Sequence, residues 1–456
     1  MAAAWQSLPS EQVTRLAREA CGTVVILDAR AGAELGVDLR SWTLGPEFLG
    51  IKLVPPGVRL LHYRTRGAAG GAEQSASHGM LLVIKPGRTV ALRWLAAADE
   101  LVPVSEPEQA GVEAAVRSGE LDARLGPYDL ERFADWQALS GCIDEATLAR
   151  ARLPLGVVVA PGGLAGAGSE PPLAGVRYAS PRFIELPRVA ALARELRARR
   201  AGAAAGAATS AGAATTTAGA ATAGAATSVA DDRAAAPWFL RNEAGAQLSA
   251  AEITALHMDP SPLVERLLAR SYGGALRGLL ADTQLALLLF LYLASLEGLE
   301  FWKGAVHLVC ASEALRRRRG AEVAAFLASM QAQLGLLPPD FFKDELLEDN
   351  FLTEALASVL GAAELAGDVA SAARQLRTAI AARFGQPVAA HLASLHDATE
   401  NDFCLASIAR SGTLEAELAS EHAAIDEQDA ASTPRAQQEV EMDLPKASAR
   451  MAWMLG

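Results

Sequence analysis

Short apolar runs separated by turn residues dominate the first half of the chain. Residues 23–27 (TVVIL), 51–54, 58–63, 80–84 and 89–94 are rich in β-branched and aliphatic side chains, which favour strands. Several short strands with turn signals between them are typical of a sandwich or a small barrel. We therefore predict that the first half of the chain folds as a β-rich domain.

Two proline-glycine sequences separate neighbouring runs in this region. Residues 55–57 (PPG) stand between the second and third runs, and residues 85–88 (KPGR) stand between the fourth and fifth. Proline excludes helix and glycine tolerates a positive φ, so both sequences predict turns. Pro86 and Gly87 fit the second and third positions of a type II turn, and we expect a hairpin-like connection there.

Helical patterns interrupt the β-rich region before it ends. They occur at about residues 108–117, 130–139 and 145–152, and strand-like sequence returns at 157–160 and 176–184. The first domain, a β-rich unit with added helices, is thus predicted to span residues 1–187.

A low-complexity linker is predicted next, at residues 188–247. Its positions 201–229 hold only Ala, Gly, Thr, Ser and a single Val. Such side chains bury too little apolar surface to offset the entropy lost on ordering, so this tract is expected to be disordered.

The second half of the chain carries helical patterns instead. Ser249 and Glu252 have the spacing of a capping box. Further helices are expected at residues 263–269, 283–296, 300–312, 321–334, 340–347, 353–365 and 369–384. Their short connections predict an antiparallel bundle or a helical superhelix over residues 248–385. The fold class is therefore α+β, and residues 386–456 are predicted to be a mostly disordered acidic tail.

The most apolar run, residues 285–296, lies between Asp282 and Glu297. It is shorter than the roughly 20 residues that cross a hydrocarbon core, and we expect it to be a buried helix of a soluble domain. The first residues, MAAAWQSLPSEQ, lack the basic and apolar regions of a secretory signal.

Charge and cysteine content narrow the function classes. The chain has 41 Lys and Arg and 53 Asp and Glu, which give a formal net charge of −12. This charge argues against a protein that binds nucleic acid through clustered basic side chains. The four cysteines are far apart and form no C-x-x-C pair, so neither a disulfide framework nor a zinc site is expected. The chain is therefore expected in a reducing compartment.

The candidate nucleotide-binding and metal-binding motifs do not have the residue spacing that these sites require. The glycine-rich residues 161–168 lack the G-x-G-x-x-G fingerprint because Pro171 stands at the third glycine position, and a flexible loop is expected. His391 and His396 are five residues apart, not the four of a helical metal pair. The other histidines considered are expected to be satisfied or exposed rather than catalytic bases; they are His62, His257 and His307.

Three further clusters are expected to be structural. A carboxylate cluster lacks calcium-loop spacing and predicts a solvated helix face; its members are Asp344, Glu345, Glu348 and Asp349. The basic run Arg316–Arg319 is expected to end a helix before Gly320. Four aromatic residues that carry much of the aromatic mass of the helical half are expected in its core; they are Trp302, Phe341, Phe342 and Phe351. We therefore expect no catalytic, cofactor-binding or metal-binding residues.

Near the C-terminus, acidic and apolar residues alternate strictly. Residues 439–445 (EVEMDLP) place Val440, Met442 and Leu444 on one side of a possible strand at 439–444. Such a segment can join an exposed sheet edge on a partner protein. The pattern alone is equally compatible with a disordered acidic tail.

An ordered series of segments resembles the AAR-two family of splicing factors, also called a1-cistron splicing factors. In the first domain the segments are residues 22–63, 92–94 (LRW), 126–128 (GPY) and 182–187 (RFIELP). In the helical half they are residues 251–258 (AEITALHM), 301–303 (FWK), 310–313 (CASE) and 337–353 (LPPDFFKDELLEDNFLT). The resemblance covers roughly residues 20–385. The tract at 201–229 and residues 386–433 depart from the family pattern.

The resemblance implies a β-rich N-terminal domain, a VHS-like helical C-terminal domain and no enzymatic activity. It implies a role in pre-mRNA splicing, as an assembly chaperone of the U5 snRNP in cytoplasm and nucleus. The implied partner is the large spliceosomal scaffold protein, bound through its RNase-H-like and Jab/MPN domains, so that helicase and RNA stay off until the particle matures. The resemblance also favours a tail strand between those two domains. No cofactor, membrane or direct nucleic-acid binding is expected.

Two other function classes remain open at this stage. A generic VHS-like adaptor would bind short peptide motifs and ignore the scaffold protein. A hydrolase or nucleotide-binding enzyme would use the loop around Gly162 and Gly163, and nucleotides would then stabilise the protein.

Overall fold

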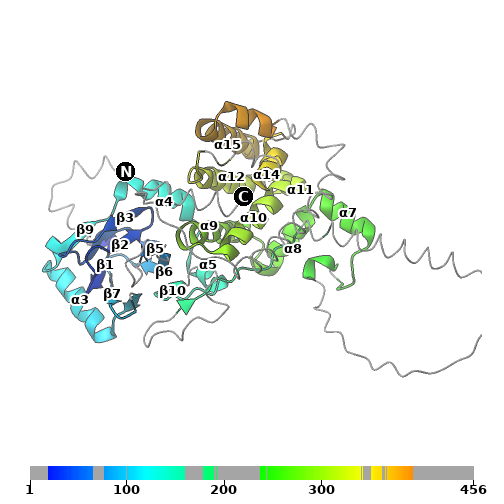
Figure 1. The fold of residues 1–456 in the computed structure, drawn as a ribbon. Coiled ribbons are helices and arrows are strands. Elements are labelled where there is room, and N and C mark those ends of the chain that lie inside the picture. Colours follow the sequence, from blue (N-terminus) through cyan, green and yellow to red (C-terminus); the bar gives the residue numbers. More distant parts are fainter. Residues whose placement is uncertain are drawn as a thin grey trace, which may run out of the picture.

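Figure 1 shows the computed structural model of the chain. The structure describes residues 19–64, 77–98, 100–159, 178–188, 192, 237–242, 244–339, 341, 351–361, 365 and 367–393. Within them, a β-rich lobe coloured blue and cyan precedes a helical lobe coloured green to orange (Figure 1). The predicted α+β class is confirmed.

Two sheets form the β-rich lobe. The first has the order β8-β7-β1-β4-β9, with strands Glu100–Pro103, Thr89–Leu95, Gly22–Leu27, Gly50–Val54 and Leu125–Pro127. The second has the order β11-β10-β6-β5-β2-β3, with strands Tyr178–Ala179, Val158–Val159, Ser77–Ile84, Gly57–Arg64, Glu34–Val37 and Arg40–Thr43. Ile26 and Leu92 of the first sheet share one core with Leu61 and Met80 of the second. The predicted sandwich is confirmed.

The two proline-glycine turns carry the chain from one sheet to the other. Residues 55–57 lead from β4 to β5 and residues 85–88 lead from β6 to β7, and in each case the two strands belong to different sheets. The hairpin-like connection expected at residues 85–88 is therefore wrong. The turn itself is of the expected kind, because Gly87 has a φ of 66° and the Arg88 N–H donates to the Lys85 carbonyl at 3.1 Å.

The register of β1 explains why no hairpin forms. The Gly87 N–H donates to the Cys21 carbonyl, and the Thr23 N–H donates to the Arg88 carbonyl. These bonds tie the turn to the start of β1, and β7 then pairs with β1 in parallel register. Strand β7 thus lies inside the first sheet, where Leu92 and Trp94 are buried.

Short helices cover the β-rich lobe. Helix α3 (Glu106–Ser118) packs Val112 against Val25 and Ala91 on the outer face of the first sheet. The others are the 3-10 helices Asp122–Arg124 (η1) and Leu130–Arg132 (η2) and the α-helices Phe133–Ser140 (α4) and Glu145–Arg150 (α5). Strands β2, β3, β8 and β9 were not predicted, because each has only three or four residues and carries glycine, proline or polar side chains.

The helical lobe begins with a 3-10 helix, Trp238–Leu240 (η3), and seven of its expected helices are described. They are Ala250–Met258 (α7), Ser261–Ser271 (α8), Leu276–Leu293 (α9), Leu296–Ala311 (α10), Gly320–Leu334 (α12), Phe351–Leu360 (α14) and Gly367–Phe384 (α15). The predicted capping box is confirmed, since the Ser249 hydroxyl accepts the Glu252 N–H and the Glu252 carboxylate accepts the Ser249 N–H. The helix expected at 340–347 lies outside the described residues, apart from Phe341.

Some boundaries differ from the expected ones. Helix α11 (Glu313–Arg318) ends in arginines as expected, but Gly320 begins the next helix rather than a loop. Part of the expected linker is structured, since η3 and a β-bridge between Arg241 and Gln247 lie there. Residues 386–393 are helical, so the helical lobe continues past the expected end at 385.

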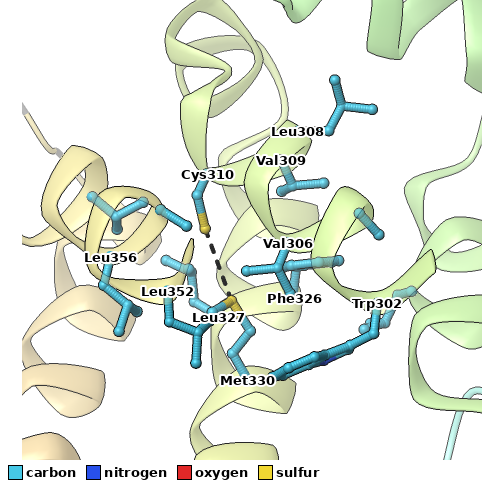
Figure 2. Close-up of a cluster of buried hydrophobic side chains, with 14 of the residues drawn as sticks. Trp302, Val306, Leu308, Val309, Cys310, Phe326, Leu327, Met330, Leu352 and Leu356 are labelled. Atoms are coloured by element: carbon cyan, nitrogen blue, oxygen red, sulfur yellow. Dashed lines mark hydrogen bonds between the residues drawn. The ribbon is translucent and has the colours of Figure 1, made fainter. Parts of the chain in front are cut away.

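Figure 2 shows the part of the helical lobe's core where α10, α12 and α14 meet; α8, α9 and α15 also contribute buried side chains to this core. Trp302 is 1% exposed, and its indole N–H donates to the Gln333 side chain at 2.8 Å. Phe341 is also buried, so the core prediction is confirmed for both; the side chains of Phe342 and Phe351 lie outside the description. Burial raises the pKa of Cys310 to about 12, which keeps this thiol neutral and unreactive.

Replacing Leu327, which is 1% exposed in this core, with alanine leaves a cavity. We expect Leu327→Ala to lower the free energy of unfolding by about 3 kcal/mol. Leu296 on α10 is 50% exposed, and the same change there should cost less than about 1 kcal/mol. Urea unfolding followed by circular dichroism measures both. Equal losses at the two positions would contradict the packing described.

Candidate functional site

Helix α9 joins the two lobes into one body. Its residues Leu285, Leu288, Leu289 and Leu293 share a buried cluster with the second sheet and with α4 and α5; the partners include Leu60, Leu81, Trp136, Leu139 and Leu148. We call this cluster the seam. Other α9 side chains, such as Leu279 and Phe290, belong to the core of the helical lobe. A helix that is apolar on all sides is stable only when it is buried on all sides.

The middle strands of the second sheet, β5 and β6, are covered on both faces because of the seam. Along β5, Leu61 joins the sandwich core, whereas its neighbour Leu60 joins the seam. Along β6, Met80 and Leu81 divide in the same way. The consecutive apolar residues at 60–61 of β5 and 80–84 of β6 are thus explained, since strands with two covered faces do not need to alternate with polar residues.

The composition of α9 alone would permit a membrane span. Over 18 residues its mean hydropathy is 1.5, yet 78% of this stretch is buried inside the protein. The prediction of a buried helix is confirmed for residues 285–293. The expected end at 296 is wrong, because Ala294, with a φ of 52°, ends α9 and Leu296 begins α10.

Two glycines allow close approach at the seam. A Cβ on Gly79 would lie 2.7 Å from Leu293 Cδ2 and 2.9 Å from the Leu61 carbonyl oxygen. The His62 ring lies over Gly36, where a Cβ would approach it within 2.1 Å. Any side chain at either glycine would push the second sheet and its neighbours apart.

His62 is neutral at the seam. Its Nε2–H donates to the Asp38 carbonyl at 3.2 Å, and its ring stands 4.7 Å from the Tyr292 ring of α9. Burial lowers the pKa of His62 from 6.5 to about 4. The prediction of a satisfied histidine is confirmed, and this residue serves packing rather than proton transfer.

A buried ion pair also crosses the seam. The Arg150 guanidinium of α5 donates to Asp282 of α9 at 2.7 Å, and the Tyr272 hydroxyl donates to the same carboxylate at 2.9 Å. The Asp282 side chain is 2% exposed; burial raises its pKa and the contact with Arg150 opposes the rise. Beside it, the Gln284 side chain accepts the Cys142 N–H at 3.0 Å.

A second buried ion pair fixes the turn at residues 55–57. Arg59 donates to the Pro55 and Pro56 carbonyls at 3.0 and 2.9 Å, and its guanidinium lies 3.5 Å from Asp38. Tyr128 donates to the same carboxylate at 2.7 Å. Burial raises the pKa of Asp38 to about 7, and the Arg59 charge opposes the rise. These groups satisfy one another around a turn.

A buried carboxylate links the two sheets on the other side of the sandwich. Glu100 of β8 is 1% exposed and accepts hydrogen bonds from the hydroxyls of Tyr63 and Tyr178. The Nδ1 of His78 lies 2.5 Å from the same carboxylate. Because these groups come from β5, β6, β8 and β11, the cluster holds the strands together.

The sequence-predicted tail residues Val440, Met442 and Leu444 lie outside the described residues. So do the acidic cluster at 344–349, the glycine-rich loop at 161–168 and His396. Among the residues that the structure does describe, no three His, Cys, Asp or Glu side chains are placed to hold a metal ion. Arg316 departs from an ordinary helix end, because it is buried and donates to the Cys310 carbonyl.

The seam was not predicted from the sequence. The available signals were the all-round apolar surface of residues 285–293 and the consecutive apolar residues at 60–61 and 80–84. Each indicates burial, but neither names the element that provides it.

Replacing one member of the Arg150–Asp282 pair should destabilise the protein more than replacing both. Arg150→Leu leaves a buried carboxylate without its cation, and we expect it to lower the free energy of unfolding by about 3 kcal/mol. Adding Asp282→Leu removes the stranded charge and should restore most of that loss. Urea unfolding of the two single variants and the double variant tests this; a double variant as unstable as the sum of the singles would refute it.

His62 should make stability depend on pH in a defined window. The unfolded side chain takes up a proton below about pH 6.5, whereas the folded one resists protonation until about pH 4. Stability from neutral His62 is therefore complete above pH 6.5 and is lost as the pH falls toward 4. Compared with His62→Gln, the wild type should lose roughly 2 kcal/mol more across that window. Parallel unfolding curves for the two proteins between these pH values would show the expectation to be wrong.

Two protein-family models match this chain, one over each lobe. Residues 20–153 match the family model for the AAR2 N-terminal domain, and residues 239–387 match that for the AAR2 C-terminal repeat region. Protein AAR2 homolog of Mus musculus is 30% identical over 336 residues, covering 73% of this chain and 80% of the mouse protein.

Two further relatives extend the comparison. Protein AAR2 homolog of Homo sapiens is 29% identical over 337 residues, with 73% and 80% of the two chains covered. The Caenorhabditis elegans homolog is 24% identical over 361 residues, with 77% and 88% covered. With both family domains matched in order over the two lobes that α9 joins, the chain belongs to the AAR2 family.

Proposed function

We propose that this chain is a pre-mRNA splicing factor that acts as an assembly chaperone of the U5 snRNP. The observation that carries the proposal is the presence of both AAR2 family domains, in order, in a single body. The seam fixes the two lobes relative to each other, so the protein presents two surfaces with one geometry. Such a body suits the capture of two domains of a larger protein in a defined arrangement.

The proposed partner is the large U5 scaffold protein, held through its RNase-H-like and Jab/MPN domains. While bound, the chain would prevent premature binding of the helicase and of RNA, and we propose that it acts in the cytoplasm and the nucleus. The net charge of −12 supports this role, because an acidic protein can cover an RNA-binding surface by charge complementarity without binding RNA itself.

The proposed mechanism is non-covalent. The buried titratable groups of the described residues, such as Asp38, Glu100 and Asp282, are engaged with neighbouring arginine or tyrosine side chains. They hold strands and helices in place, which supports a role in binding rather than in catalysis.

The tail strand at 439–444 is the proposed direct contact. Its alternation would place Val440, Met442 and Leu444 on the same side of a strand added to the partner's sheet. Backbone hydrogen bonds would supply part of the affinity, and these three side chains would supply the fit.

Binding to a partner fragment that carries the RNase-H-like and Jab/MPN domains tests the proposal. We expect a one-to-one complex of the full chain in size-exclusion chromatography. The triple variant Val440→Asp, Met442→Asp and Leu444→Asp should weaken it at least about tenfold, since each change puts a charge on the docked face. The measurement is the Kd from titration calorimetry.

A matched control uses the alternating acidic residues of the same segment. The variant Glu439→Gln, Glu441→Gln and Asp443→Asn keeps the apolar face and should bind at least as well as the parent. No complex between folded partners would refute the assembly role and favour a peptide-binding adaptor. A complex unaffected by the apolar triple variant would refute only the tail strand.

A further inference from the structure

An arginine-tryptophan cluster lies on the helical lobe, away from the seam. Trp238 of η3 is half-buried beside α8, and the guanidinium carbons of Arg266 and Arg270 each stand 5.5 Å from the centre of its ring. Arg241 follows one residue after η3. We call Trp238, Arg241, Arg266 and Arg270 the arginine-tryptophan site.

Backbone hydrogen bonds and a buried phenylalanine hold the site in place. Arg266 donates to the Arg241 carbonyl at 2.6 Å and to the Trp238 carbonyl at 3.3 Å. Phe239, which meets the Trp238 ring edge-on at 5.9 Å, is buried in a small apolar cluster with residues of α7 and α8. The ring and the guanidinium groups are therefore pre-positioned, which reduces the entropy lost when a ligand binds.

Among the described residues, no carboxylate balances the positive charge of the site. Within the described part of the chain, no carboxylate forms an ion pair with Arg241, Arg266 or Arg270. The neighbouring Glu265 is engaged elsewhere, because it pairs with Arg319 at 2.8 Å. Arg266 and Arg241 each use one guanidinium nitrogen for backbone carbonyls. A guanidinium has five N–H donors, and the remaining ones can bind carboxylates in a planar way.

The chain carries a segment of the complementary charge. Residues 415–429 contain six carboxylates and no Lys or Arg. Residues 394–456 together hold twelve carboxylates and four basic residues, so they contribute −8 to the net charge of −12. The strongest negative charge of the molecule is thus concentrated near the C-terminus, on the same chain as an unbalanced cationic site.

We propose that the arginine-tryptophan site docks the acidic segment 415–429 of its own chain. The carboxylates would bind the exposed edges of Arg241, Arg266 and Arg270. Docking would hold residues 439–444, which begin ten residues later, close to the helical lobe.

Chain length permits this contact. The last helical residue described is 393, and 21 residues (394–414) separate it from Glu415. Fully extended, such a stretch spans up to roughly 75 Å, which exceeds the diameter of a domain of about 150 residues. Because both groups belong to one molecule, the effective concentration of the segment is on the order of millimolar, so that weak charge pairs suffice.

An acidic peptide fits the site better than a nucleic acid. The two arginines already cover the ring on which a base would stack.

Competition between the chain's own segment and an added copy tests the inference. The probe is a fluorescein-labelled peptide of residues 411–431, and its binding is followed by fluorescence anisotropy. In one full-length variant the six carboxylates of 415–429 are changed to their amides. This variant should bind the peptide at least about tenfold more tightly than the wild type does, because its site is no longer occupied. Raising the salt from about 50 to about 300 mM should weaken the binding.

Arg270 is the best position at which to test the location of the site, because its side chain makes no hydrogen bond to another described residue, and replacing it should disturb the fold least. In the amide background, Arg270→Glu should reduce peptide affinity at least about tenfold, and Arg270→Gln should reduce it less. Arg377→Glu, at an exposed arginine on α15, is the matched control and should change affinity less than about twofold. Thermal unfolding of each variant confirms that it is folded.

Three outcomes would overturn the inference. They are equal peptide binding by the wild type and the amide variant, a loss with Arg377→Glu as large as that with Arg270→Glu, and displacement of the peptide by single-stranded RNA at lower concentrations than by unlabelled peptide. The inference does not depend on the proposed splicing function, since no snRNP component enters the test.

Discussion

The burial of helix α9 on all sides is the constraint on which the rest of the structure depends. Its leucines form the seam with the second sheet and also enter the core of the helical lobe. Removing either lobe would expose a row of apolar side chains to water, at roughly 25 cal/mol for each Å² uncovered. The two AAR2 family domains are therefore mutually dependent parts of one body rather than independent modules on a tether.

Polar groups at and near the seam set its geometry. Apolar contacts resist separation of the lobes but discriminate weakly between small shifts of one surface along the other. The Arg150–Asp282 pair and the Gln284 hydrogen bonds are directional and buried, so a displaced arrangement would leave charges or donors unpaired. The glycines at positions 36 and 79 set the closest approach. The result is a body with one arrangement of its two lobes.

Such a body and an acidic C-terminal segment have complementary uses in an assembly factor. The fixed lobes offer constant surfaces to a large partner, while residues 394–456 carry most of the net charge. If the arginine-tryptophan site holds part of that charge in the free protein, the proposed partner-binding strand at 439–444 starts from a position near the body. Binding of the scaffold would then exchange an internal charge contact for an external strand contact.

The sequence by itself determined the element types and the family. Strands β1, β4, β5, β6 and β7 follow from short β-branched runs, and the capping box at Ser249 marks a helix start, because these signals act between near neighbours. The ordered family segments indicated the AAR2 family, while the tail residues Val440, Met442 and Leu444 stay a prediction. Only the tertiary structure decided that the turn at 85–88 changes sheets, that α9 covers β5 and β6, and that Arg266 and Arg270 flank Trp238. These features join residues far apart in the chain, and a local pattern signals burial without specifying which distant surface provides it.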